Sequence, residues 1–215
     1  MRRINTFVFA TIAIQLASMM AVMTGCGSKP VSRPINVAFV HYLPAGREYA
    51  ITDQFFTALL QGGLPEGSHA AFYYGDGSKE WGGDYKNRAA VSHYEAIANP
   101  SGRTGCDIMK AVRDARQQLM KFSKPDRRNL LIIIAPLNPW NGTQAEKQQA
   151  TELLHYSFPD ARGQQLEVFV IGVPEDHQPE VMRAWQGHFT KPLHLFDLTD
   201  ELHYSDFGLP KSKRD

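Results

Sequence analysis

Residues 130–135 read LLIIIA, an unbroken apolar run dominated by leucine and isoleucine. A strand buried on both faces of a sheet needs such a run because neither face meets water, and strands of this kind occur in parallel sheets covered by helices. Residues 35–40 (INVAFV) and 168–173 (VFVIGV) repeat the pattern, and residues 69–74 (HAAFYY) and 192–196 (PLHLF) are further candidates. The chain is therefore predicted to build a mainly parallel sheet in which strand 35–40 lies beside strand 130–135.

Apolar residues three and four positions apart predict helices between these strands. The predicted buried faces are Ile51, Phe55, Ala58 and Leu59 in one helix, Ile108, Val112, Ala115 and Leu119 in a second, and Met182, Trp185 and Phe189 in a third that begins near Pro179. A capping-box sequence at 143–146 opens a fourth helix. Strands alternating with helices predict an α/β domain at residues 35–205, with a three-layer, Rossmann-like, mainly parallel sheet and helices on both faces. Residues 206–215 are expected to form a polar tail.

The N-terminus has the layout of a secretory signal. Two arginines at positions 2 and 3 precede an uncharged apolar stretch at 7–23, which is the order of charge and hydrophobicity in signal peptides. The stretch ends in MTGC at 23–26, which resembles the lipobox of bacterial lipoproteins. Residues 1–25 are therefore expected to be a signal peptide, Cys26 the lipidated residue, and residues 26–34 a tether. The alternative is an uncleaved helical anchor, because an apolar stretch of this length lies near the lower limit for crossing a bilayer.

Composition excludes several classes of function. Removing residues 1–25 takes away two basic residues and no acidic one, so 21 basic and 22 acidic residues remain, a formal charge of −1. A nucleic-acid binder is usually more basic. Cys106 is the one cysteine besides Cys26, so no internal disulfide is expected in the mature chain. The eight histidines show no spacing typical of zinc ligands, and neither a structural metal nor a cofactor is predicted.

Three segments together resemble the von Willebrand factor A-like domains over residues 35–202. These are residues 104–119, which place a threonine-containing turn before a helix, residues 128–135, and residues 166–174, which read LEVFVIGVP. Their order and spacing match the family. The resemblance implies the three-layer α/β fold and a ligand site at the carboxyl ends of the strands.

The family's metal-ion-dependent adhesion site is degenerate in this sequence. The resemblance would require an Asp-x-Ser-x-Ser loop after the first strand, but His41, Leu43 and Ala45 stand at those positions. The later aspartate is absent from residues 135–137, and only Thr104 matches. One hydroxyl cannot satisfy the octahedral oxygen shell of Mg²⁺. The domain is therefore predicted to be metal-independent, and Thr104 is expected to begin or cap its helix.

Residues 74–85, YGDGSKEWGGDY, are the most unusual segment of the chain. Their glycines and acids predict a mobile, glycine-rich loop with solvated carboxylates, without the spacing of a calcium-binding loop. Tyr73, Tyr74, Trp81 and Tyr85 are residue types that anchor protein interfaces. They could instead pack under the loop as a minor core.

The sequence predicts a lipid-anchored cell-envelope protein that acts as a binding or scaffolding module and is not an enzyme. Its partners are expected to be the membrane, through the lipid on Cys26, and an unidentified envelope protein. The expected contact residues are Tyr42, Trp81, Tyr85 and Trp140. Gly27 stands where an inner-membrane retention signal would have aspartate, which favours the outer membrane, with the domain facing the periplasm or the cell surface.

Two alternatives are retained. The first is an enzyme or small-ligand binder that uses the pocket at the carboxyl ends of the parallel strands, where open α/β sheets bind ligands. Its expected wall residues are His41, Tyr42, Thr104, Asn138 and Trp140, with His41 as a possible general base. The second is a retained metal-dependent adhesion function, which the missing oxygen ligands argue against.

Overall fold

The structure is a computed structural model, and the residues that it describes lie within Arg33–Asp215. It describes residues 33–42, 49–101, 107–136, 144, 147–148, 151–152, 166–185 and 193–209. Cys26, Leu43, Ala45, Thr104, Asn138, Trp140 and most of the helix predicted after residue 143 lie outside these residues. Among the described residues, no helix has the length and hydropathy that crossing a membrane requires.

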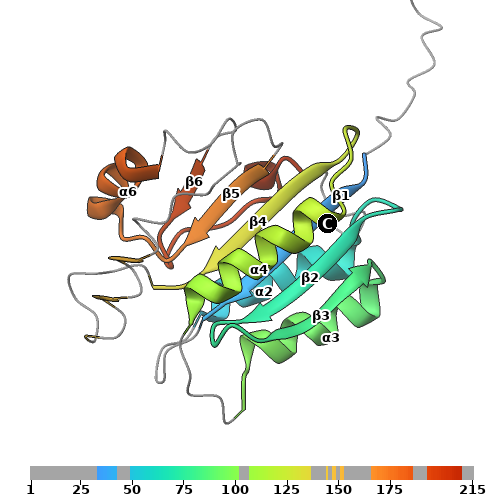
Figure 1. Ribbon diagram of the computed structural model, residues 1–215, viewed down its shortest axis with the longest axis horizontal. Coiled ribbons are helices and arrows are strands. Elements are labelled where there is room, and N and C mark those ends of the chain that lie inside the picture. The colour runs from blue at the N-terminus through green and yellow to red at the C-terminus, as the bar shows by residue number, and fades with distance from the viewer. Residues whose placement is uncertain are drawn as a thin grey trace, which may run out of the picture. The chain divides into compact units, whose positions relative to one another are not determined.

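Six strands form a single sheet. The strands are β1 (Ile35–His41), β2 (His69–Tyr74), β3 (Lys79–Asp84), β4 (Arg128–Ile134), β5 (Leu166–Ile171) and β6 (Leu193–Phe196). Their order across the sheet is β3-β2-β1-β4-β5-β6 (Figure 1). All neighbours are parallel except β2 and β3, which are antiparallel. This confirms the predicted mainly parallel sheet and the pairing of strand 35–40 with strand 130–135.

The strand order reverses direction between β1 and β4. From β1 the chain builds outward to β2 and β3, and it then returns to place β4 on the other side of β1. In open α/β sheets the carboxyl ends of the strands at such a reversal flank the crevice that binds ligands. The position after His41, at the end of β1, is therefore the first place to look for a site.

Helices cover both faces of the sheet. They are α2 (Ala50–Gly62), α3 (Asn87–Ala98), α4 (Ile108–Lys121) and α6 (Gln178–Trp185), with short 3-10 helices η1 (Glu175–His177) and η3 (Tyr204–Phe207). One face is covered by α4 and α6, which bury Ile108, Val112, Ala115, Leu119 and Trp185. The predicted buried face of α4 is confirmed, and so are the three layers.

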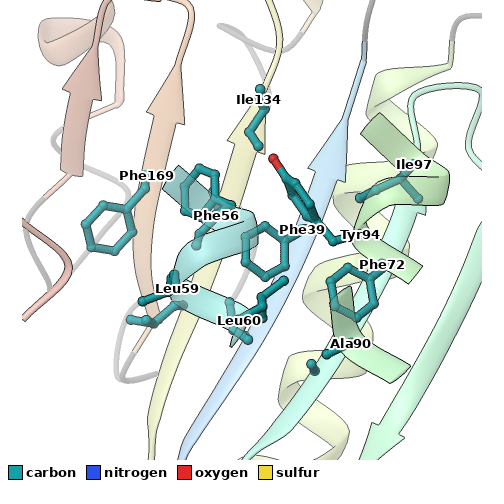
Figure 2. Close-up of a cluster of buried hydrophobic side chains, with 14 of the residues drawn as sticks. Phe39, Phe56, Leu59, Leu60, Phe72, Ala90, Tyr94, Ile97, Ile134 and Phe169 are labelled. Carbon is teal, nitrogen blue, oxygen red and sulfur yellow. The ribbon is translucent and has the colours of Figure 1, made fainter. Parts of the chain in front are cut away.

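The second core lies under α2, α3 and the segment that ends in η3. Phe39 of β1 is at its centre, stacked on Phe72 at 5.4 Å and meeting Phe56 and Tyr94 edge-on (Figure 2). Such pairs add stability beyond the apolar area that they bury. Sequence periodicity did not find α3, because most of its apolar residues are alanines and it buries only a narrow stripe of Ala90, Tyr94, Ile97 and Ala98.

The predicted face of α2 was wrong by one residue. Its buried residues are Thr52, Phe56, Leu59 and Leu60, whereas Ile51 is 59% exposed and Ala58 is exposed. One residue is about 100° of helix rotation, enough to turn a side chain from the core to solvent. The true buried stripe has the same spacing as the predicted one. It begins with the polar Thr52, and a search for apolar residues therefore misses it.

Two further expectations are corrected by the structure. The helix after residue 104 is capped by Asp107, whose side chain accepts a hydrogen bond from the backbone N–H of Lys110 at 3.0 Å. The packed domain also continues past residue 205, because Phe207 is fully buried in the second core. Arg128 holds this segment by donating hydrogen bonds to the carbonyls of Phe207 and Gly208.

Candidate functional site

A buried polar cluster occupies the carboxyl end of β1. His41 is the last residue of β1, and its Nε2 lies 2.9 Å from Oδ1 of Asp53, in the first turn of α2. Tyr94 of α3 donates its hydroxyl hydrogen bond to the same oxygen at 2.8 Å. Because a carboxylate only accepts, Nε2 of the imidazole is the donor in its contact with Asp53. The cluster joins β1, α2 and α3 at the reversal of the sheet.

This cluster is closed to solvent on the histidine side. The His41 side chain has no exposed surface, whereas that of Asp53 is 23% exposed. The rings of Tyr49 and Tyr94 meet the imidazole edge-on at 5.8 and 6.1 Å. Within the described residues, Nδ1 of His41 has no hydrogen-bond partner. An imidazole without solvent access cannot serve as a general base for an external substrate in this conformation.

Tyr94 stays protonated in this cluster. Its burial raises the pKa of the phenol well above its usual value of 10.0, and the charge of Asp53 and the hydrogen bond to it raise it further. The hydroxyl is therefore a permanent donor to Asp53 over the physiological pH range. No sequence pattern pointed to Asp53 or Tyr94, because neither forms a recognisable spacing with His41.

Tyr42 follows His41 and points to the other face of the sheet. It is half-buried against the core that lies under α4 and α6. Its backbone N–H donates to the carbonyl of Ile134 at 2.9 Å. Gly75, at the end of β2, lies so close that a Cβ there would be 2.6 Å from Tyr42 Cβ and Cδ2. A glycine is required at this contact because any side chain would overlap the tyrosine ring. Tyr42 is thus part of a tightly packed strand end.

The described residues contain no group of three or more histidine, cysteine, aspartate or glutamate side chains arranged to hold a metal ion. At the position of the family's first metal ligand stands His41, which is already engaged with Asp53. The other positions named for this site, Leu43, Ala45 and Thr104, lie outside the described residues. Metal independence therefore stays a prediction.

The segment predicted as a mobile loop contains a strand. Residues 79–84 form β3, which pairs antiparallel with β2 and is an edge of the sheet. The glycines at 82 and 83 obscured this strand, because glycine is rare in strand interiors. The turn itself is short, with Gly77 at φ 83° and Asp76 accepting a hydrogen bond from the backbone N–H of Ser78 at 2.8 Å.

Trp81 is half-buried on the α3 side of this edge strand. Its indole stacks on the His93 ring with centroids 5.0 Å apart and planes 7° from parallel. His93 Nδ1 lies 3.2 Å from Glu80 Oε1, and the hydroxyl of Tyr74 donates to Glu80 Oε2 at 2.5 Å. These contacts hold one face of the indole in a fixed orientation, and its remaining surface belongs to the exposed edge of the sheet.

Of the four predicted contact residues, the three that the structure describes do not form one patch. Asp84 pairs with His69 in the strand register, so β3 ends where β2 begins. Tyr85 therefore lies at the end of the sheet where β2 begins, whereas Tyr42 lies at the opposite end, after β1. The hydroxyl of Tyr85 donates to the carbonyl of Leu60, and burial raises its pKa. Tyr85 thus joins the end of β3 to α2, and of the three described contact residues only Trp81 belongs to the edge strand.

A groove lies on the α4 side of β3, and no pattern in the sequence predicted it. The groove has a volume of about 680 Å³. Its lining residues are Tyr73, Lys79, Asp114, Gln117, Gln118 and Lys121. The hydroxyl of Tyr73 donates to the backbone carbonyl of Asp114 at 3.3 Å, and burial and the charge of Asp114 raise the pKa of Tyr73 to about 12. Only the antiparallel addition of β3 brings Lys79 to face α4.

Comparisons with known proteins give little beyond the fold. No family model matches the chain, and no curated protein matches it. Among solved structures, the chain is similar to the crystal structure of the conserved hypothetical protein BatB from Bacteroides thetaiotaomicron. The two are 15% identical with a TM-score of 0.41, over 66% of this chain and 68% of that one. The α/β fold assignment rests on the strand order and pairing described above.

Proposed function

We propose that this protein is a lipid-anchored component of the bacterial cell envelope whose α/β domain binds another envelope protein. The MTGC sequence at 23–26 supports the anchor at Cys26. The domain would act as a metal-independent binding or scaffolding module held near the membrane, with the outer membrane favoured. Several acyl chains on one cysteine would make the attachment effectively stable.

The observation that carries the binding proposal is the open edge of β3. An edge strand presents main-chain N–H and C=O groups that can pair with an added strand. Beside Gly82 and Gly83 of β3, the half-buried Trp81 contributes apolar surface near this edge. Tryptophan is among the residues that contribute most to binding energy at protein interfaces.

The closed state of His41 favours binding over catalysis. Its Nε2 is engaged with Asp53 and its side chain is fully buried. The pocket alternative would depend on this residue as a base, and its other walls, Thr104, Asn138 and Trp140, lie outside the described residues. Nothing in the described strand ends favours that alternative over a protein contact at β3.

In vivo photo-crosslinking tests the proposed surface. A photoreactive amino acid at Asp84, whose side chain is 81% exposed at the end of β3, is expected to yield one discrete adduct with an envelope protein. Adding Trp81→Ala should reduce adduct formation by tenfold or more, on the order of the loss seen for a hot-spot residue. The matched position is Arg113, which is exposed on α4 and away from β3.

The expected pattern is an adduct from Asp84 and none from Arg113. Thermal unfolding of Trp81→Ala must stay close to that of the wild type for the result to report on binding. Adducts of equal yield from both positions, or an Asp84 adduct that Trp81→Ala leaves unchanged, would refute β3 as the contact surface.

A further inference from the structure

The groove beside α4 exists because the helices stop short of the sheet edge. On this face α4 packs on β1, β2 and β4, and no other described helix covers β3. The open face of β3 and the outer side of α4 therefore form the two walls. Lys79 comes from β3, and Gln117, Gln118 and Lys121 come from α4. These residues lie on the opposite face of β3 from Trp81, which pairs with Phe72 in the other core.

Lys79 lines the groove along the strand. Its Nζ lies 6.0 Å above the centre of the Tyr73 ring, within the range of a cation–π contact. A Cβ on residue 82 would be only 2.8 Å from Cε and Nζ of Lys79. The absence of a side chain at Gly82 thus lets the lysine lie along the strand. Lys79 remains an exposed residue, and its ammonium group lies beside the Tyr73 ring.

The groove carries two cations without a matching anion. Its one carboxylate, Asp114, pairs with Lys110 at 3.0 Å. No described carboxylate lies within 4.0 Å of Lys79 or Lys121. Partial burial lowers the pKa of Lys79, and the charge of Lys121 lowers it further, as expected for two ammonium groups that face the same space. A bound anion would favour the charged ammonium and would therefore oppose both causes that lower the pKa of Lys79.

The types of residue in the lining indicate the class of anion. Paired arginines suit the planar carboxylate, whereas lysines act as point charges and commonly bind phosphate. Two lysines balance the charge of about −1.5 to −2 on a phosphate monoester near pH 7. The side-chain amides of Gln117 and Gln118 can donate to the remaining oxygens. The groove volume of about 680 Å³ is in the range of small-molecule sites, so it can hold an organic group as well.

We propose that the groove between α4 and β3 binds a phosphate ester, with Lys79 and Lys121 holding the phosphate and Gln117 and Gln118 contacting its oxygens or the attached organic group. The same chemistry could come from a soluble metabolite or from the headgroup of an anionic lipid. The site is independent of the proposed protein contact, because Trp81 lies on the other face of β3.

Calorimetric titration of the purified full-length protein tests the proposal. The probes are inorganic phosphate, glycerol 3-phosphate and a short-chain, water-soluble phosphatidic acid. Saturable binding of at least one ester is expected, with a dissociation constant below about 1 mM at low salt. Lys79→Ala combined with Lys121→Ala should weaken it at least tenfold. The control is Lys86→Ala combined with Lys124→Ala, which removes two exposed lysines elsewhere and should change affinity less than twofold.

A second measurement separates binding from a structural effect. Titration of ¹⁵N-labelled lysine side chains by NMR should show that the ester raises the pKa of Lys79, because a nearby anion favours the charged ammonium. Equal affinities for the two esters would indicate a soluble ligand, and tighter binding of phosphatidic acid would indicate a lipid headgroup. Absence of saturable binding, or equal weakening in the control variant, would overturn the proposal.

Discussion

His41 Nε2 and Asp53 Oδ1 lie 2.9 Å apart, and this contact ties the end of β1 to the first turn of α2. His41 stands where the resemblance to the von Willebrand factor A-like domains would require an acidic metal ligand. Its side chain is fully buried and is already engaged with Asp53. Tyr94 completes the contact by donating to the same oxygen from α3.

Replacing His41 with alanine should destabilise the domain by about 2–4 kcal/mol, because it leaves a cavity and removes the donor to a partly buried carboxylate. Urea denaturation followed by circular dichroism measures the change. The control is Gln54→Ala, at an exposed position on α2, the helix that carries Asp53. Its free energy of unfolding should stay within about 0.5 kcal/mol of that of the wild type. Equal stability of the two variants would show that the His41–Asp53 contact contributes nothing to folding.

Two isoleucines provide a matched test of the layers. Ile133 of β4 is 0% exposed and Ile51 of α2 is 59% exposed. Ile133→Asp should prevent cooperative folding, because an unpaired carboxylate would be buried in an apolar layer. Ile51→Asp should be nearly neutral, since the acid meets solvent in the first turn of a helix, where negative charge is favoured. Expression yield and thermal unfolding compare the two, and a soluble, cooperative Ile133→Asp protein would contradict the assigned core.

Gly172 marks a backbone contact that no side chain can replace. It has φ of +120°, and a Cβ there would lie 2.0 Å from the carbonyl oxygen of Ala135. Gly172→Ala should therefore cost more than about 3 kcal/mol, from strain and overlap together. Gly67→Ala tests strain alone, since φ is +80° but the nearest atom is 3.6 Å away, and about 1 kcal/mol is expected. Similar losses in the two variants, measured by urea denaturation, would argue against the close approach.

His194 should make stability fall in mild acid. It stacks on Phe169 at 4.4 Å, and burial lowers its pKa from 6.5, with smaller effects of Glu167, Arg128 and Asp206. A lowered pKa in the folded state means that the unfolded chain binds the proton more readily. The contribution of neutral His194 is therefore complete above about pH 6.5 and is lost as the pH falls below that value.

His194→Phe keeps an aromatic ring against Phe169 and removes the titrating group. Urea midpoints of wild type and variant between about pH 8 and pH 5 should diverge, with a smaller loss in acid for the variant. Parallel pH profiles for the two proteins would show that His194 does not carry this dependence.

The lipid anchor gives the most direct test in cells. If Cys26 carries the proposed anchor, Cys26→Ser should block metabolic labelling with a fatty acid and leave a larger, uncleaved precursor, because it removes the thiol that would accept the lipid. Cys106→Ser removes the other cysteine and should change neither labelling nor size. Labelling that persists in Cys26→Ser, or a wild-type chain that is never shortened, would favour a helical anchor.

The central sheet could be read from the sequence because a strand buried on both faces must be apolar at every position. This holds for residues 130–135 and, apart from Asn36, for residues 35–40, and the two strands pair as predicted. The periodicity of α4 was equally clear, since its buried face has only apolar side chains. In these elements local composition and tertiary environment impose the same pattern.

Other features depended on contacts between residues distant in sequence. The buried Thr52 shifted the face of α2, and the glycines at 82 and 83 hid β3, because the antiparallel pairing with β2 and not local propensity makes that segment a strand. Nothing local joins His41 to Tyr94, or Lys79 to Lys121, across the chain. The sequence alone therefore determined which segments form the core, whereas only the tertiary structure decided which polar side chains meet, because that depends on the order in which the strands are placed side by side.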